Sequence, residues 1–211
     1  MKLFIDLCCG LGGASQAFWD DSSWFVIRID NNEELLELTQ GLTLLDIVET
    51  ANVMNVMTAI IRGHGYNWED FDQIVVWSSP PCNEFSTAFN APKSVAARND
   101  EEYSPDMTLV KASMQLIEFI DPEFWYIENV RGAITDFEPL LGRWRQQVGS
   151  FFLWGNHPMV DFEDNSHRSI KKLDKGAADM RAQWRAKVPI EISQAIKDSI
   201  DKQLTLDRYF S

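Results

Sequence analysis

The stretch KLFIDLCCGLGG (residues 2–13) sets the fold, because an apolar strand runs directly into a glycine-rich turn. The segment ASQAFWDD (14–21) then has helical character, and the same strand-to-helix pattern recurs along the chain. Period-two and continuous apolar runs predict further strands at 24–30, 42–47, 71–78, 124–130 and 150–155. Helical spacing of apolar residues predicts helices at 31–40, 53–63, 107–120 and 188–200.

Strands that alternate with helices indicate an α/β protein, and we expect one sheet with helices on both faces. Ligands of such sheets bind at the carboxyl ends of the strands. The chain has 211 residues, is 45% hydrophobic and has no internal repeat, so we expect a single domain over residues 1–211. No apolar run approaches the roughly 18 residues that span a bilayer, and no membrane association is expected.

Charge is distributed unevenly along the chain, whose net charge is −13. Residues 1–139 carry 7 Lys/Arg against 23 Asp/Glu, whereas residues 140–190 carry 9 against 5. The basic excess lies in 165–187, above all in RSIKKLDKGAADMRAQWRAK (168–187). This asymmetry indicates either a local face that contacts nucleic acid or a solvated basic helix.

Three cysteines are too few for a disulfide framework, and the adjacent Cys8 and Cys9 cannot usefully bridge each other. This usage is typical of a reducing compartment, and we expect a cytoplasmic protein. The sequence has no pattern of metal ligands, so no metal site is expected.

The glycine turn predicts a nucleotide-type ligand, since Gly10, Gly12 and Gly13 let a ligand approach the main chain closely. The spacing is G-x-G-G, and Ser15 stands where the dinucleotide pattern G-x-G-x-x-G has glycine. A nucleoside without a pyrophosphate fits this turn better, and S-adenosylmethionine is the obvious candidate. An ordinary tight turn is the alternative.

Acidic residues end the next two strands. Asp30 is placed to bind a pair of ribose hydroxyls, and Asp46 is placed to bind an adenine amino group. These acids would complete the site for the same nucleoside, unless they are incidental.

A cysteine follows two prolines in DQIVVWSSPPCNEFS (72–86). Pro80 and Pro81 end the strand and hold the backbone in an extended path, which gives the Cys82 thiol a fixed direction suited to nucleophilic attack. A half-buried thiol in a turn is the alternative. The polar stretch 83–106 that follows is long for a loop, which favours a functional role.

Glu128 stands among aromatic residues in WYIENV (125–130). Burial there would raise the pKa of its carboxyl group. A protonated Glu can donate to a ring nitrogen while it accepts from an exocyclic amine, a pair that cytosine presents along one edge. The alternative is a structural Glu that caps a loop.

FIDLCCGLGGAS (4–15), SSPPCNEFS (78–86) and YIENVRG (126–132), in this order, resemble the motifs of cytosine-5 DNA methyltransferases. The resemblance covers about residues 3–135, and 188–196 resembles the family's closing helix more weakly. It implies a Rossmann-like S-adenosylmethionine-dependent methyltransferase. Cys82 would add to carbon 6 of a cytosine flipped out of double-stranded DNA, Glu128 would hold nitrogen 3 and the 4-amino group, and 83–106 would be a closing lid.

The expected contacts follow from these motifs and strand ends. For the cofactor they are Asp6, Cys8, Cys9, Gly10, Leu11, Gly12, Gly13, Asp30, Asn31, Asp46, Ile47, Ser79, Pro81 and Leu109. For the substrate they are Ser86, Asn129, Arg131 and Arg168.

The chain departs from the family pattern in three places. Cys8 replaces an aromatic residue, and the family's Arg-x-Arg positions hold Val148, Gly149 and Ser150, so one of Arg143, Arg145, Arg131 or Arg168 would have to contact the base. Only 33 residues separate Gly155 from Pro189, which leaves no room for an ordinary target-recognition domain. We therefore expect a short or relaxed recognition site, or a partner chain that supplies specificity, as in a minimal phage or bacterial enzyme.

Two other interpretations stay open. The substrate could be RNA or a free cytosine nucleotide, given the acidic body and the missing recognition domain. The chain could also be a catalytically weakened regulatory subunit that binds the cofactor, although such a subunit has no chemical need for both Cys82 and Glu128.

Overall fold

A computed structural model of the chain describes residues 1–162 and 181–210. Their strands form one seven-stranded sheet in the order β3-β2-β1-β4-β5-β7-β6. The strands are β1 (Lys2–Leu7), β2 (Trp24–Asp30), β3 (Leu42–Leu44), β4 (Gln73–Ser78), β5 (Phe124–Asn129), β6 (Gln146–Val148) and β7 (Phe151–Trp154). β3, β2, β1, β4 and β5 run parallel, whereas β7 is antiparallel to both β5 and β6. The expected Rossmann-like α/β sheet is confirmed.

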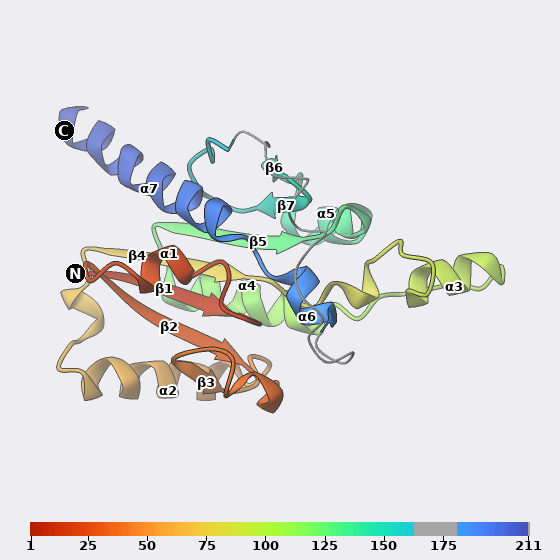
Figure 1. Ribbon diagram of the computed structural model, residues 1–211, viewed down its shortest axis with the longest axis horizontal. Helices are drawn as coiled ribbons and strands as arrows, with labels where there is room; N and C mark the ends of the chain where they lie inside the picture. The colour runs from red at the N-terminus through yellow and green to blue at the C-terminus, as the bar shows by residue number, and fades with distance from the viewer. Residues whose placement is uncertain (163–180, 211) are drawn as a thin grey trace.

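Helices cover both faces of this sheet, as expected (Figure 1). They are α1 (Gln16–Trp19), α2 (Thr50–Gly63), α3 (Pro92–Arg98), α4 (Thr108–Ile120), α5 (Ile134–Leu141), α6 (Arg181–Ala186) and α7 (Ile190–Phe210). Short 3-10 turns are η1 (Glu33–Leu35), η2 (Trp68–Asp70), η3 (Cys82–Glu84) and η4 (Arg131–Ala133). None of the helices in the described ranges is long and apolar enough to cross a membrane.

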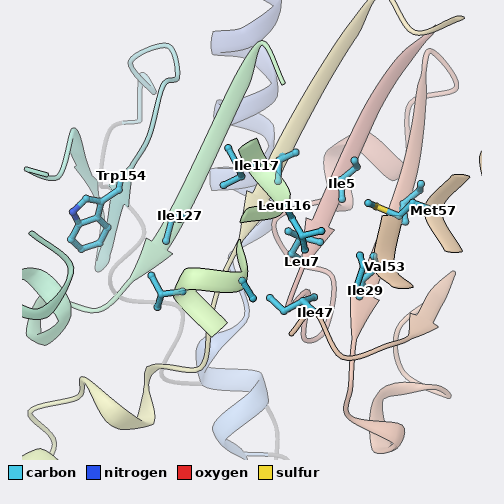
Figure 2. Packing of buried hydrophobic residues seen from close by; sticks show 14 of the residues in the cluster. Ile5, Leu7, Ile29, Ile47, Val53, Met57, Leu116, Ile117, Ile127 and Trp154 are labelled. Carbon is cyan, nitrogen blue, oxygen red and sulfur yellow. The ribbon is translucent and has the colours of Figure 1, made fainter. Parts of the chain in front are cut away.

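The pleat of the sheet produces two hydrophobic cores. On β1, Leu3, Ile5 and Leu7 point to the face covered by α2 and α4, and Figure 2 shows this packing. Phe4 points to the opposite face, where it stacks on Phe18 of α1 at a centroid distance of 4.0 Å. Each fully buried Leu, Ile or Phe side chain contributes about 1.5–3 kcal/mol, so both faces fix the sheet and with it the positions of the strand ends.

The helix predicted over 31–40 is wrong, because only the 3-10 turn η1 forms there. Asn32 caps this turn, with its side chain accepting from the Glu34 N–H. Leu35 is buried, but Leu36 and Leu38 are about half exposed, so an amphipathic helix has no surface to pack against. Such a short helix is marginal without tertiary contacts.

Other differences lie at element boundaries and in one hairpin. α1 is half the length of the predicted helical stretch 14–21, and α7 begins at Ile190 and continues to Phe210. β6 was not expected; a two-residue turn at 149–150 joins it to β7. Most of the basic stretch 168–187, Arg168 included, lies outside the described residues.

Candidate active site

The predicted site residues gather where the parallel strands end. The glycine turn follows β1, Asp30 ends β2, Cys82 follows β4, and Glu128 lies near the end of β5. These strands all run toward the side of the molecule on which α3 projects (Figure 1). Because β1 and β4 are neighbours, the glycine turn and the cysteine turn leave the sheet side by side. The strand order reverses at this pair, which is where α/β sheets open a crevice for ligands.

The glycine turn is tied to Asp30. Gly10 and Gly12 have positive φ angles of 52° and 64°, and the turn between β1 and α1 needs both. The Gly10 N–H donates to Asp30 Oδ2 at 2.9 Å, and the Asn32 N–H donates to Oδ1 at 3.0 Å. Each carboxylate oxygen keeps further acceptor capacity, so Asp30 can hold the turn and still accept from a ligand hydroxyl.

Arg28 supports the glycine turn from below, a role that the sequence analysis missed. This arginine is only 2% exposed. Its Nε donates to Ser15 Oγ at 2.8 Å and its Nη2 to the Gly12 carbonyl at 3.4 Å. Ser15 in turn donates to Asp6 Oδ2 at 2.6 Å. A Cβ on Gly12 would lie 2.9 Å from the guanidinium, so Arg28 and Gly12 require each other.

Asp6 is a buried acid beneath the turn. Burial raises its pKa to about 7, against the opposing effects of the Ser15 hydrogen bond and the Arg28 charge. Its Oδ1 has no hydrogen-bond partner. A carboxyl group with this pKa is partly protonated near neutrality, so a cation that enters the turn would favour its charged form.

Acidic groups surround the glycine turn. Burial raises the pKa of the Cys8 thiol, and the charges of Asp30, Asp6 and Asp46 raise it further. Asp46 is exposed, and its Oδ1 accepts from the Val48 N–H at 3.0 Å, so it begins the turn into α2. The negative charge around the glycine turn therefore favours a cationic ligand and disfavours a pyrophosphate.

Cys82 begins the turn η3 after Pro81, where the chain leaves the extended conformation. Its carbonyl accepts from the N–H groups of Phe85 at 3.1 Å and Ser86 at 2.9 Å, which fixes the backbone on both sides of the thiol. The side chain is half-buried. Burial raises the pKa of the thiol, and the negative charge of Glu128 raises it further. The two side chains are therefore electrostatically coupled.

Glu128 is 9% exposed, and burial raises the pKa of its carboxyl group to about 7. A hydrogen bond from Ser79 acts in the opposite direction. The Trp77 indole N–H donates to Ser79 Oγ at 2.6 Å. Because indole is only a donor, the Ser79 hydroxyl proton is directed to the carboxylate. Ser79, expected at the cofactor, thus has a contact with Glu128.

Asn129 links the end of β5, which carries Glu128, to the turn that carries Cys82. Its Nδ2 donates to the Pro80 carbonyl at 2.9 Å, and its Oδ1 accepts from the Val130 N–H at 2.9 Å. Just beyond it, a Cβ on Gly132 would lie 2.1 Å from the Phe85 carbonyl oxygen, so only glycine permits this approach of the two turns. Asn129 is 1% exposed, and its side-chain amide is hydrogen-bonded within the chain. Its contact with substrate stays a prediction.

Residues 3–141 match the family model described as C-5 cytosine-specific DNA methylase. The chain belongs to this family. The glycine turn, the cysteine turn and the glutamate strand all fall within the matched range.

Solved structures with a similar arrangement include two methyltransferases. One is described as a DNA modification methyltransferase encoded within an E. coli prophage; it is 18% identical with a TM-score of 0.42, over 74% of this chain and 47% of that one. The other is the Entamoeba histolytica methyltransferase EhMeth, 12% identical with a TM-score of 0.45, over 83% of this chain and 61% of that one. The chain therefore spans less than two thirds of either protein. A search of curated proteins gave no match.

The family's arginine positions fall on the hairpin between β6 and β7. Val148 is buried and ends β6, and Gly149 and Ser150 form the turn. The hairpin lies beside the site, since Phe152 of β7 pairs with Asn129. Arg143, Arg145 and Arg131 are all exposed, and Arg168 lies outside the described residues. Contact of one of these arginines with the base stays a prediction.

The C-terminal helix returns to the glycine turn. Ser193 Oγ donates to the Ala14 carbonyl at 2.6 Å and accepts from the Ala17 N–H at 3.0 Å. Gly13 packs against the residues before α7, because a Cβ there would lie 2.4 Å from the Val188 carbonyl oxygen. The weak resemblance of 188–196 to a closing helix thus corresponds to a segment that does pack on this turn.

The remaining expected residues lie around the same edge. Cys9, Leu11 and Ile47 are buried, Ser86 and Leu109 are half-buried, and Asn31 and Pro81 are exposed. Their contacts with a ligand stay predictions.

Proposed function

We propose that this chain transfers a methyl group from S-adenosylmethionine to carbon 5 of a cytosine in DNA, through a covalent bond between Cys82 and carbon 6. The observation that carries the proposal is the coupled pair of Cys82 and Glu128, held at adjacent strand ends next to the glycine turn. Burial disfavours the charged form of each group, so neither stabilises the fold through its charge.

The first half of the site fits the cofactor. S-adenosylmethionine supplies the methyl group as an electrophilic sulfonium. Gly10 and Gly12 provide an open main chain, Asp30 provides acceptors for ribose hydroxyls, and the carboxylates near Cys8 provide negative charge for a cationic ligand. Asp46 lies two residues after the end of β3 and is exposed, so its carboxylate can accept from the adenine amino group.

Cys82 and Glu128 act on the cytosine together. The Cys82 thiolate forms a bond to carbon 6, and the ring electrons move to carbon 5 as Glu128 shares its proton with nitrogen 3. Carbon 5 would then bond to the methyl group that S-adenosylmethionine supplies when bound, as the bond between that methyl group and sulfur breaks. Loss of the carbon 5 proton to a base restores the ring double bond and expels the Cys82 thiolate. A neutral cytosine is a poor electrophile, so nucleophile and acid are needed in one step.

The electrostatic coupling sets the order of events. An ionised Glu128 opposes formation of the Cys82 thiolate, whereas a protonated Glu128 does not. With a pKa of about 7, Glu128 is half protonated near neutrality. A cytosine that hydrogen-bonds to the protonated form selects the state in which the thiol ionises more easily. Substrate binding thus activates the nucleophile.

We also propose that residues 1–211 form one catalytic domain that acts on double-stranded DNA. Flipping is needed because carbon 6 is not reachable inside the duplex. With 33 residues between Gly155 and Pro189, recognition of a long sequence would need a partner chain.

The test is methyl transfer from labelled S-adenosylmethionine to duplex DNA, with the product nucleoside identified by mass spectrometry. Single-stranded DNA, RNA, dCMP and the variant Cys82→Ala run alongside. Label in 5-methylcytosine from duplex DNA, absent in the variant, is the expected result. Label only in RNA or in dCMP would show that the substrate is RNA or a free nucleotide rather than DNA. Cofactor binding with no transfer to any substrate would favour the regulatory-subunit interpretation, which the missing Arg-x-Arg motivates.

A further inference from the structure

The outer edge of β2 is covered along only part of its length. β2 extends over residues 24–30, but β3, its neighbour on the outer side, pairs only with residues 28–30. Within the described residues no strand pairs with residues 24–27 on that side. β2 lies at this side of the sheet with α2 alongside it (Figure 1). In the described structure, residues 24–27 therefore form an open strand edge.

Two hydrogen bonds show which backbone groups of β2 face this edge. The Ile29 carbonyl accepts from the Cys9 N–H at 3.0 Å, on the β1 side. The Asp30 carbonyl accepts from the Leu45 N–H at 2.9 Å, on the β3 side. Because the backbone groups of successive strand residues point alternately to the two neighbouring strands, the even-numbered residues of β2 face the outer edge.

Val26 carries the open backbone groups. Both its N–H and its C=O face the outer edge, beside which no described strand lies, whereas the Trp24 N–H is bonded to the Asp21 carbonyl at 3.0 Å. Folded proteins usually protect such an edge with lysine, proline or a bulge. Residues 24–27 are Trp-Phe-Val-Ile, with neither a charge nor a proline. An edge of this composition is suited to pairing with an added strand.

A groove of about 490 Å³, the edge groove, lies along these residues, and its apolar walls come from both faces of the sheet. Phe25, Ile60 and His64 line it from the α2 face, where His64 packs on Phe25 at a centroid distance of 5.0 Å. Trp19 of α1 and Trp24 line it from the opposite face. The side chains of an added strand alternate between the two faces, so they would find apolar contacts on each.

Trp24 also brings an unpaired donor to the edge groove. The residue is 6% exposed, and its indole N–H has no hydrogen-bond partner among the described residues. A buried donor without a partner is costly, and Trp24 lines the groove. This observation is independent of the open strand edge, and it likewise indicates that a polar partner is missing here.

The charge around the edge groove favours a basic partner. Residues 19–64, which include every residue that lines the groove, contain eight acidic residues against Arg28 and Arg62. Arg28 is only 2% exposed, beneath the glycine turn. A segment rich in Lys and Arg is therefore attracted to this part of the molecule, and an acidic segment is repelled. A second copy of this chain would bring a net charge of −13 to the same surroundings, which opposes self-association through this edge.

We propose that the edge groove binds an extended, basic segment of a partner protein, which adds a short strand beside residues 24–27 of β2. β3 occupies the edge from Arg28 onward, so the added strand is short. Its backbone bonds to the N–H and C=O of Val26, and its side chains lie alternately toward Trp19 and toward Phe25. The inference goes beyond the proposed function, because the groove lies along the first half of β2 and the candidate active site lies beyond the other end of the strands.

Selection from a random peptide library tests this inference. Displayed peptides of about ten residues, the upper length of a typical strand, are selected on wild-type protein and counter-selected on Val26→Pro, which lacks the edge N–H. We expect the enriched peptides to alternate apolar and polar residues and to contain Lys or Arg. Synthetic copies should bind wild type about tenfold more tightly than Val26→Pro, because backbone hydrogen bonds are lost. They should also slow hydrogen exchange of the Val26 amide, measured by NMR.

A second set of variants decides the question if Val26→Pro does not fold. His64 is exposed and lines the groove, so His64→Lys should weaken binding of a basic peptide by about two- to fivefold and His64→Glu should strengthen it by a similar factor. Asn55→Lys, exposed on the same helix but outside the groove, is the matched control and should have a smaller effect.

Three results would overturn the proposal. The first is a selection that enriches no peptide, or only acidic ones. The second is an enriched peptide that leaves the exchange of the Val26 amide unchanged or is insensitive to the charge at His64. The third is self-association of the wild-type protein in analytical ultracentrifugation that Val26→Pro or His64→Lys abolishes, which would assign the edge groove to a second copy of this chain instead.

Discussion

Replacement of Glu128 by Gln tests the raised pKa on which the proposed chemistry depends. In the unfolded chain the carboxyl loses its proton near pH 4.5, whereas in the folded chain it keeps the proton up to about pH 7. Wild-type stability therefore falls as pH rises from 4.5 to 7, and the whole cost is present above pH 7. A shift of about 2.5 pKa units at 1.36 kcal/mol per unit corresponds to about 3 kcal/mol. Gln removes this cost and keeps an oxygen that can accept from Ser79.

The assay is urea unfolding of wild type and Glu128→Gln at pH 8 and at pH 5. The variant should be more stable by about 3 kcal/mol at pH 8 and by less than about 1 kcal/mol at pH 5. Asp6 also has a pKa of about 7, but it is present in both proteins and cancels in the difference. Glu118→Gln, exposed on α4, is the matched control and should differ from wild type by no more than about 0.5 kcal/mol at either pH. A difference for Glu128→Gln that is the same at both pH values would refute the reasoning.

Three further substitutions test the scaffold of the site. Gly12→Ala should cost about 2 kcal/mol or more of unfolding free energy and weaken cofactor binding measured by calorimetry, since φ is 64° and the new Cβ would lie 2.9 Å from Arg28. Asn129→Ala should cost about 1–3 kcal/mol, because the buried Pro80 carbonyl loses its donor; methyl transfer should fall further than the loss of folded protein explains. Lys93→Met should leave cofactor binding unchanged and speed chymotrypsin cleavage within residues 83–106, because the Lys93 contacts with the Gly132 carbonyl at 3.0 Å and Asp136 Oδ2 at 2.6 Å are lost. Cleavage at the wild-type rate would show that Lys93 does not hold this segment.

The central strands of the fold were predictable because their patterns leave few alternatives. FWYIEN and QIVVWS are buried on both faces as β5 and β4, and continuous apolar runs of this length are typical of parallel strands between two helical layers. The helix expected over 31–40 failed for the opposite reason. Its capping signal is genuine, but whether Leu36 and Leu38 find a surface depends on neighbours that are distant in sequence. Tertiary packing, which a local pattern does not contain, decides such short helices.

The supporting residues of the site were harder to predict than the reacting ones. Glu128 stands out because a carboxyl group is costly in apolar surroundings, and Cys82 stands out because two prolines fix the backbone before it. In the sequence, Arg28 occupies a polar position of an alternating strand. The neighbouring residues do not indicate that it is buried beneath the turn at Gly12, 16 residues earlier. A signal exists all the same, since Lys2 and Arg28 are the only basic residues before Arg62. A lone arginine in so acidic a segment is expected to pair with an acidic side chain. The Ser79 and Asn129 contacts depend on the register of β4 against β5, which emerges only from the assembled sheet.

The strand order separates two electrostatically different groups of residues at the candidate site. Along the carboxyl edge, β3, β2 and β1 carry Asp46, Asp30 and the glycine turn, and β4 and β5 carry Cys82 and Glu128. The first group lowers the potential where a sulfonium would lie. The second group is apolar enough that its carboxyl stays half protonated at pH 7. The boundary between them is the β1–β4 pair, so a methyl donor on one side and a base on the other would meet there. Under the proposed function, the negative charge beside the glycine turn would therefore favour the cationic methyl donor.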